Sequence, residues 1–502
     1  MIKYDKLCSA IAENNWSFLI ENIKPKDFAR DDEGNLINKN ILAKLAETLT
    51  SPDLNIPNNV KIVILKCFGN ACLAGYVYEE FSQDIKDDKL LHDCCHKLYA
   101  LLIDSPKTTS ESFPYDGIIQ WTVNYILTHF DVPEDSKDCL EMLRLSVQFL
   151  CNLLFVSENK NLPAPLITDD FKSAIIFLAA PKQIPICRAA CTFLHNALKT
   201  SSESYYKGLQ VHRMVETLIA ADKLEVHVAG QSLLVLLKRL HWLESVYEDL
   251  SIESKLYLLA IIHQDVSETV YSESDSGKST NFPNDLVEFL SKRFKRRSDL
   301  ILKTVDSYLD GTEPEEISLL LDIIGVISCK DSQECCILQN DKSLVINCIF
   351  LLKSIHMAGK ESNNHFTPLQ KLNDVAPCNW EMNSGQETIQ NHPAFGFKAA
   401  LIRAIGNLVH KHKGNQKLLR ETDAIPLLLD CCNIDARNPL IMQWAIFALR
   451  NVCEQSPENQ EVIRNCNRIG IIDNEMIKEM GIKLQETEDG KGIGIIPLPR
   501  NE

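Results

Sequence analysis

An internal repeat of 44 residues near the C-terminus limits the folds open to this chain more than any other feature of its sequence. Residues 402–420 and 446–464 both read Ile-x-Ala-x-x-Asn, then Asn-Gln, then Arg, at one constant offset that superposes Asn407 on Asn451. A repeat of this length typically forms one supersecondary unit, whose apolar face is buried only when neighbouring units stack on it. The chain is therefore expected to build a stack of similar units around one continuous core.

The asparagine of this repeat also closes three similar segments in the N-terminal half, at Asn70, Asn152 and Asn196. In all five copies the residues five before, two before and one after the asparagine are apolar, which is the spacing of a buried helical stripe. Asn152 and Asn196 are again 44 residues apart, and Asn70 lies 82 residues before Asn152, close to two periods. The sequence therefore predicts an all-α, armadillo/HEAT-like right-handed superhelical solenoid with repeats of about 40–44 residues.

Two roles are open for the recurring asparagines. In armadillo-like folds the inner helix of each unit lines a concave groove, where an amide can hydrogen-bond the backbone of an extended peptide. Alternatively, each asparagine satisfies a neighbouring loop or helix end and touches no ligand, because most side-chain hydrogen bonds go to backbone or water. With the polar residues on the same helices added, the candidate partner-binding groove comprises Asn70, Asn152, Asn196, Arg403, Asn407, Gln443, Arg450 and Asn451.

Two stretches without clear helical patterning divide the chain. Residues 271–284 are rich in Ser, Asp and Asn, which indicates an exposed loop. Residues 356–393 form a longer break, typical of an insertion or connector, in which Phe366 and Trp380 are candidates for contact with the core. The predicted organisation is an N-terminal armadillo-like lobe (1–270), the exposed loop (271–284), middle helical repeats (285–355), the insertion (356–393), a C-terminal armadillo-like domain (394–485) and a loose tail (486–502).

The strongest positive cluster is a short basic run on a predicted helix. It could serve as a nuclear localisation signal or as a dock for an acidic partner. The alternative is an ordinary solvated helix face, since short basic runs are common. The residues of this basic run are Lys292, Arg293, Lys295, Arg296 and Arg297.

Composition narrows the classes of function. The formal net charge of −16 repels phosphate backbones, so general nucleic-acid binding is not expected. The N-terminus carries charge throughout and no apolar stretch is long enough to span a bilayer, so we expect neither a signal peptide nor membrane insertion. The 18 cysteines are scattered, many of them in apolar runs, and no CxxC pair occurs. Buried free thiols persist in reducing compartments, so a cytoplasmic location is predicted.

The sequence offers no candidate for catalysis. Gly277-Lys278-Ser279 lacks the leading glycine of a phosphate-binding loop, and the glycines at 490–494 are followed by no helix. HExxH and GxSxG motifs are both absent. His92 and His96 lack a third and a fourth metal ligand. We therefore predict a protein that is no enzyme and that needs neither a cofactor nor a metal.

The C-terminal block has a more specific resemblance. Residues 438–451, NPLIMQWAIFALRN, closely resemble the signature of the ataxin-10 family, and so do residues 402–408 with the following Asn415-Gln416. The resemblance is strong over 397–463 and thin over the N-terminal lobe. It implies an armadillo-like fold, self-association, and a cytoplasmic address that includes perinuclear, centrosome and midbody positions. It also implies scaffold roles in cytokinesis, neuritogenesis, neuron survival and signalling, with a G-protein β subunit and the O-GlcNAc transferase as partners.

The repeat and the resemblance together favour a non-catalytic cytosolic protein-interaction scaffold. A second hypothesis is a transport-type armadillo adaptor that binds a linear cargo signal, for which the acidic net charge would suit a basic cargo. Against it, only the copy that ends at Asn451 carries a tryptophan, Trp444, so no regular Trp-plus-Asn ladder is present. The tryptophan itself is expected to lie in the core, as large aromatic residues usually do.

Overall fold

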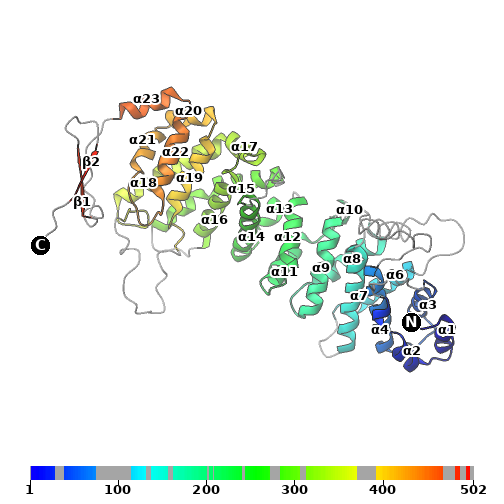
Figure 1. The fold of residues 1–502 in the computed structure, drawn as a ribbon. Helices are drawn as coiled ribbons and strands as arrows, with labels where there is room; N and C mark the ends of the chain where they lie inside the picture. The colour runs from blue at the N-terminus through cyan, green and yellow to red at the C-terminus, as the bar shows by residue number, and fades with distance from the viewer. Residues whose placement is uncertain are drawn as a thin grey trace, which may run out of the picture. The chain divides into compact units, whose positions relative to one another are not determined.

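The computed structural model describes residues 2–28, 39–74, 115–131, 137–155, 162–200, 203–206, 208–239, 243–271, 283–305, 312–369, 392–466, 481–486 and 493–497 of the chain. The chain divides into two compact units, Met1–Trp242 and Leu243–Glu502 (Figure 1). The boundary between the two units lies after Trp242, whereas the sequence predicted an N-terminal lobe that ends at residue 270, before the loop at 271–284. Residues 272–282 of that loop lie outside the described residues.

The first unit is built of helices in its described part. They are α1 (Tyr4–Ala12), α2 (Trp16–Asn22), η1 (Pro25–Phe28), α3 (Lys39–Thr50), α4 (Asn58–Ala74), α6 (Tyr115–His129), α7 (Lys137–Phe155), η3 (Ala164–Ile167), α8 (Asp169–Leu178), α9 (Ile184–Thr200), α10 (Glu203–Tyr206), α11 (Val211–Asp222) and α12 (Val228–Arg239).

The second unit continues in the same way and ends in a hairpin. Its elements are α13 (Leu243–Tyr247), α14 (Ile252–Tyr271), α15 (Asn284–Arg297), η4 (Ser298–Val305), α16 (Thr312–Ile327), α17 (Gln333–Asn340), α18 (Lys342–Glu361), α19 (Phe397–Val409), α20 (Lys413–Glu421), α21 (Ala424–Asp430), α22 (Ile441–Cys453), α23 (Pro457–Asn465), β1 (Ile482–Glu486) and β2 (Ile493–Pro497).

One helix from each successive repeat stacks on its counterpart in the next. In the first unit α4, α7, α9 and α12 pack in this order, and in the second unit α14, α16, α19 and α22 do so (Figure 1). We call these the inner helices. Their apolar residues are buried on both sides of the stack, as Ile402 and Leu408 of α19 illustrate. The prediction of an all-α helical solenoid is confirmed, whereas the armadillo/HEAT type of the repeat and the right-handed superhelix stay predictions.

The insertion at 356–393 begins later than the sequence indicated, because α18 continues to Glu361. After this helix the chain folds back, and a Cβ atom at Gly359 would lie 2.4 Å from the carbonyl oxygen of Phe366. Glycine is thus required where the returning chain crosses the helix. Phe366, one of the two aromatic residues that were candidates for contact with the core, is buried. Trp380 lies outside the described residues.

The predicted loose tail also differs in part. Residues 493–497 form β2, which pairs antiparallel with β1 in a register that places Leu484 opposite Ile495. The three isoleucines of β2 favour extended backbone, because β-branched residues are enriched in strands. Among the described helices one, α18, is long and apolar enough to cross a membrane by length and composition, a test that the core helix of a soluble protein also passes.

Candidate functional site

In the first unit the recurring asparagines join one inner helix to the element before it. Asn152 donates from Nδ2 to the carbonyl oxygen of Gly69 at 2.9 Å, and Asn196 donates to that of Cys151 at 3.2 Å. Each acceptor is the residue directly before the asparagine of the preceding inner helix. Asn70 comes first and donates to the carbonyl oxygen of Pro25 in η1 at 2.8 Å. The asparagines therefore bond successive layers of the stack.

The second unit repeats the same bond. Asn451 donates to the carbonyl oxygen of Gly406 at 3.0 Å, and Asn407 donates to that of Gly325 in α16 at 3.1 Å. By this register the asparagine position of α16 is Val326, which is buried and has no amide to donate. The middle of the chain thus keeps the stacked helix while it lacks the residue that makes the repeat visible in the sequence.

Burial favours bracing as the role of these asparagines. Asn451 is 2% exposed, and Asn152 and Asn407 are buried as well. Their amide groups already donate to backbone carbonyls of the neighbouring inner helix, so these donors are not free for a ligand. Asn70 and Asn196 are partly exposed, and Asn70 still has an Oδ1 acceptor without a partner among the described residues. Of the five asparagines, Asn70 thus retains the clearest capacity to bind a ligand.

A second set of side-chain amides also braces the repeats. From the sequence these residues indicated only the 44-residue spacing of the repeat. Asn459 donates to the carbonyl oxygens of Val452 at 2.8 Å and Gln416 at 3.0 Å. Asn415, 44 residues earlier, donates to that of Leu408 at 2.9 Å. Each therefore bonds the carbonyl seven residues before it, at the end of the inner helix. Their constant offset was the signal that could have identified them as structural residues.

Arg403 is held by packing between three inner helices. Its guanidinium lies 3.4 Å from Asp322 Oδ1 on α16 and 5.7 Å from the ring centroid of Trp444 on α22. Burial raises the pKa of Asp322, although Arg403 and His263 oppose this shift. At Gly325 a Cβ atom would lie 2.8 Å from the arginine, so the glycine makes room for it. Arg403 is therefore a packing residue and a poor probe of partner binding.

The open face of α22 is the most accessible part of the predicted groove. Gln443, Ile446 and Arg450 are exposed on this face with Met442, and Ile446 is 56% exposed. Leu440, at the start of the helix, is exposed too and has a left-handed backbone with φ of 62°. A leucine in this conformation costs about 1–2 kcal/mol. The inner helix at this end of the stack thus presents apolar side chains to solvent.

The preceding inner helix shows what this face normally does. The residues 44 positions earlier on α19 are Ala399, Ile402 and Gly406, and all three are buried. At Gly406 a Cβ atom would lie 3.2 Å from Ala448 Cα of α22, so glycine permits this close approach. The counterpart of Gly406 on α22 is Arg450. The open face of α22 therefore corresponds to a stacking surface of α19, with an arginine at the position where α19 has the glycine that permits the close approach.

A small hollow lies beside the inner helices α4 and α7 of the first unit. Its volume is about 200 Å³, and its lining includes Pro25, Lys66, Asn70 and Gln148. Gln148 donates from Nε2 to Oδ1 of Asn152 at 3.1 Å, which uses the remaining acceptor of that asparagine. The hollow can therefore offer Asn70 and Gln148 to a bound segment, whereas Asn152 is already occupied.

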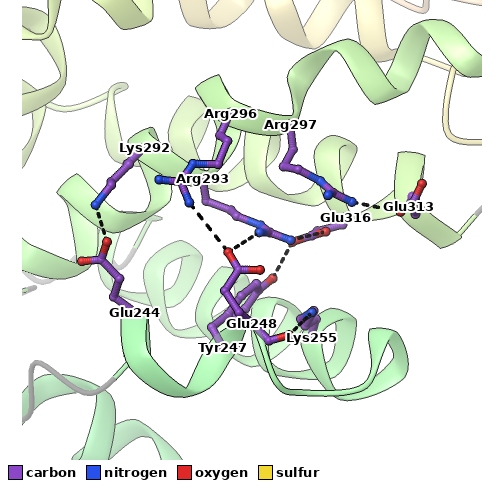
Figure 2. Close-up of polar contacts among 10 residues, drawn as sticks. All are labelled: Glu244, Tyr247, Glu248, Lys255, Lys292, Arg293, Arg296, Arg297, Glu313 and Glu316. Atoms are coloured by element: carbon purple, nitrogen blue, oxygen red, sulfur yellow. Dashed lines mark hydrogen bonds and ion pairs between the residues drawn. The ribbon is translucent and has the colours of Figure 1, made fainter.

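The basic run lies on α15, where each of its five residues is paired with an acidic residue (Figure 2 draws all of them but Lys295). Lys292 pairs with Glu244, and Arg297 pairs with Glu313 at 2.9 Å. Lys295 lies 2.6 Å from Asp341, and Arg296 lies 3.9 Å from Glu248. The cluster is therefore largely neutralised within the second unit. This arrangement weakens both predicted uses, as a localisation signal and as a dock for an acidic partner, and it differs from a freely solvated face.

Arg293 forms the buried centre of this network. Its Nε lies 2.9 Å from Glu316 Oε1, and the two side chains are 5% and 1% exposed. Tyr247 donates from its hydroxyl to the same carboxylate at 2.9 Å, and its ring lies under the guanidinium with 5.3 Å between Arg293 Cζ and the centroid (Figure 2). Burial and then the Glu316 charge raise the pKa of Tyr247, so the hydroxyl stays a donor. The network joins α13, α15 and α16.

Asp341 performs two tasks at the edge of the same cluster. Its Oδ1 accepts from the Leu344 backbone N–H at 3.1 Å, which caps the N-terminus of α18, and its Oδ2 pairs with Lys295. Burial disfavours the charged form, but Lys295 and hydrogen bonds from Ser343 and Ser291 outweigh this effect and lower the pKa of Asp341 to about 2. The carboxylate is therefore ionised at neutral pH and serves as structure.

Within the described part of the chain, no group of three or more His, Cys, Asp or Glu side chains is placed to hold a metal ion. The candidate pair His92 and His96 lies outside the described residues, as does Gly277-Lys278-Ser279. The cysteines that the structure describes are free thiols.

The comparisons with known proteins point to one family. The family model that matches residues 397–493 is described as the spinocerebellar ataxia type 10 protein domain. Ataxin-10 of Xenopus tropicalis is 36% identical over 249 residues, which are 49% of this chain and 48% of that protein. Ataxin-10 of Bos taurus is 27% identical over 391 residues, 74% of this chain and 75% of the bovine protein. The alignment thus spans about half the length of the Xenopus relative.

Among solved structures, the crystal structure of an engineered protein aligns with 90% of this chain and 99% of its own, at 12% identity and a TM-score of 0.30. A TM-score this low supports no conclusion about the fold. The family match, by contrast, covers α19 and α22, the helices whose repeat first suggested the resemblance. The chain is thus similar to the ataxin-10 proteins, and the likeness is strongest over the C-terminal domain.

Proposed function

We propose that this chain is a non-catalytic protein-interaction scaffold whose C-terminal domain binds protein through the open face of α22. The observation that carries the proposal is the exposure of Ile446, with Met442 beside it, at a position whose counterpart on α19, Ile402, is fully buried. Exposed apolar side chains grouped on one face mark sites of protein interaction. Gln443 and Arg450 add polar contacts around them.

A second copy of the chain is the occupant that we propose first. The face belongs to the domain in which the ataxin-10 likeness is strongest, and self-association is what the resemblance implies. Arg450 does not permit the close approach that Gly406 permits between α19 and α22, so we expect two copies to meet in another arrangement. A symmetric pair brings the same apolar residues of both copies together, which is the commonest form of homo-oligomer.

Replacing Ile446 with glutamate is expected to shift a self-associated population toward monomer. Two like charges would then face each other in an interface from which water is excluded, which costs several kcal/mol, so the dissociation constant should rise by about a hundredfold or more. Sedimentation velocity over a range of protein concentrations would measure this change. The far-ultraviolet circular dichroism should stay that of the wild type, because the side chain is exposed.

The matched control is Leu224→Glu, which changes an exposed leucine in the first unit and should leave the association constant unaltered. A wild-type chain that remains monomeric at all concentrations would contradict self-association. Equal association constants for wild type and Ile446→Glu would move the contact away from α22.

The wider roles form part of the same proposal and rest on the resemblance to the ataxin-10 family. They are scaffolding in cytokinesis, neuritogenesis, neuron survival and signalling, with a G-protein β subunit and the O-GlcNAc transferase as partners. The proposed address is cytoplasmic, with perinuclear, centrosome or midbody association. The open face of α22 supports a scaffold because it offers exposed apolar and polar side chains for contact with another protein.

The hollow beside Asn70 favours a second candidate function, an adaptor that binds a linear signal. Asn70 and Gln148 can hydrogen-bond an extended backbone there, and Lys66 at the rim pairs with Glu141 at 3.2 Å. Fluorescence anisotropy with a panel of short basic and acidic peptides tests it. If the adaptor function is correct, one peptide class binds and Asn70→Ala weakens it about tenfold, the effect of a lost hydrogen bond in a desolvated site. Absence of binding by every peptide would exclude it.

A further inference from the structure

Helix α18 has apolar residues on two opposite faces. One face is buried in the second unit and includes Leu344, Cys348, Leu352 and Ile355. The other face carries Ile346, Phe350 and Met357, which are all exposed, Phe350 to 56%. The three residues are spaced by four and seven positions, which places them on one line along the helix. We call this line the α18 ridge.

Lysines follow one side of the α18 ridge. Lys342, Lys353 and Lys360 are exposed and fall on neighbouring helical positions, 11 and 7 residues apart. Lys360 pairs with Asp430 at 3.1 Å, whereas Lys342 and Lys353 form no ion pair within the described part of the chain. The row extends over about 27 Å of helix. This positive edge is notable on a chain of net charge −16, whose basic run on α15 is already neutralised.

We propose that the α18 ridge binds an amphipathic helix of a partner protein, with the partner's apolar residues on the ridge and its acidic residues against the lysines. A ridge with four- and seven-residue spacing packs into the groove of another helix, and about three turns of helix cover it. The lysines specify the charge of the partner. This contact is separate from the open face of α22 and adds a second class of partner to the proposed scaffold.

An anionic membrane surface is a weaker match for the same residues. Three apolar side chains bury too little area for stable interfacial binding, which requires a broad apolar face on the helix. The acidic net charge of the chain also repels anionic lipids beyond the reach of the lysine row. A protein helix needs only local complementarity, because exposed charges farther than about 10 Å are screened at ordinary salt.

Two synthetic peptides of about 18 residues test the inference, one of leucine and glutamate in helical spacing and one with every glutamate replaced by lysine. With fluorescein-labelled peptides and the full chain, the acidic peptide should bind at least about tenfold more tightly than the basic one, and less tightly as salt rises. Ile346→Ser/Phe350→Ser should weaken binding of the acidic peptide about tenfold or more. Lys342→Glu/Lys353→Glu should reverse the preference between the peptides.

Two controls separate this contact from the others. Leu224→Ser changes an exposed leucine in the first unit, and Ile446→Glu changes the open face of α22, so both should bind the acidic peptide as the wild type does. If Ile446→Glu fails to self-associate but still binds peptide, the two surfaces act independently. Equal affinity for both peptides, or full affinity in Ile346→Ser/Phe350→Ser, overturns the inference. If the chain binds phosphatidylserine vesicles but neither peptide, and Ile346→Ser/Phe350→Ser abolishes the vesicle binding, the ridge is assigned to a membrane instead.

Discussion

Arg293→Met is expected to lower the free energy of unfolding by about 3–5 kcal/mol. The loss arises because Glu316 is 1% exposed and would remain charged and buried without its main partner. The Tyr247 hydroxyl would still donate to this carboxylate, but a neutral donor cannot replace a guanidinium that forms two bonds to it. Equilibrium urea unfolding followed by circular dichroism measures the change as a lower transition midpoint of the second unit.

Arg296→Met is the matched control for this prediction. Arg296 is 59% exposed and lies 3.9 Å from Glu248, so its loss should change stability by less than about 0.5 kcal/mol. The double variant Arg293→Met/Glu316→Leu removes both charges and should recover much of the loss, since a buried ion pair can be replaced by apolar residues at little net cost. If Arg293→Met unfolds at the wild-type urea concentration, the buried pair does not exist in solution.

Asn451→Ala is expected to lower the free energy of unfolding by about 1–3 kcal/mol, because it leaves the carbonyl of Gly406 without the amide that reaches it at 3.0 Å. The higher helix propensity of alanine offsets about 0.5 kcal/mol of this loss. The measurement is again urea unfolding. Self-association of the folded chain should be unchanged, because the asparagine is buried between α19 and α22 and is not on the open face.

Gln443→Ala on the same helix supplies the comparison, since it also removes an amide but from an exposed position. It should leave stability within about 0.5 kcal/mol of the wild type. The opposite pattern, with Asn451→Ala stable but unable to associate, would show that this asparagine binds a partner and does not brace the stack.

The sequence alone predicted the stacked architecture because the residues that hold one inner helix against the next recur every 44 residues. Asn407 and Asn451 each satisfy a carbonyl of the helix before them, so both the asparagine and its apolar neighbours are constrained in each unit. Where the constraint is absent, as at Val326, the repeat could not be seen in the sequence although the helix stacks in the same way. Periodicity therefore revealed the repeats that carry the asparagine and missed those of α12, α14 and α16, which have none.

The candidate site was less predictable, because exposure depends on contacts between distant residues. The basic run was recognised by composition, but its acidic partners lie as far away as Glu244 and Asp341 in the sequence, and nothing local marks them. Arg403 was predicted as a contact residue because it is polar, and nothing in the sequence indicated that Asp322 and Trp444 lie beside it. Residues 486–502 were predicted to form a loose tail, because nothing in their sequence indicated that 493–497 pair with Ile482–Glu486.

The exchange of Gly406 for Arg450 has a consequence for how long such a protein can become. If the gene segment for the last repeat were duplicated, the added helix could not repeat the close approach that α22 makes to α19 at Gly406, because it would meet the arginine there. In the first unit α9 stacks on α7 although this position is Cys151, so an added helix would need either Arg450→Gly or a different packing. The residue at this position therefore decides how closely a further repeat could approach α22.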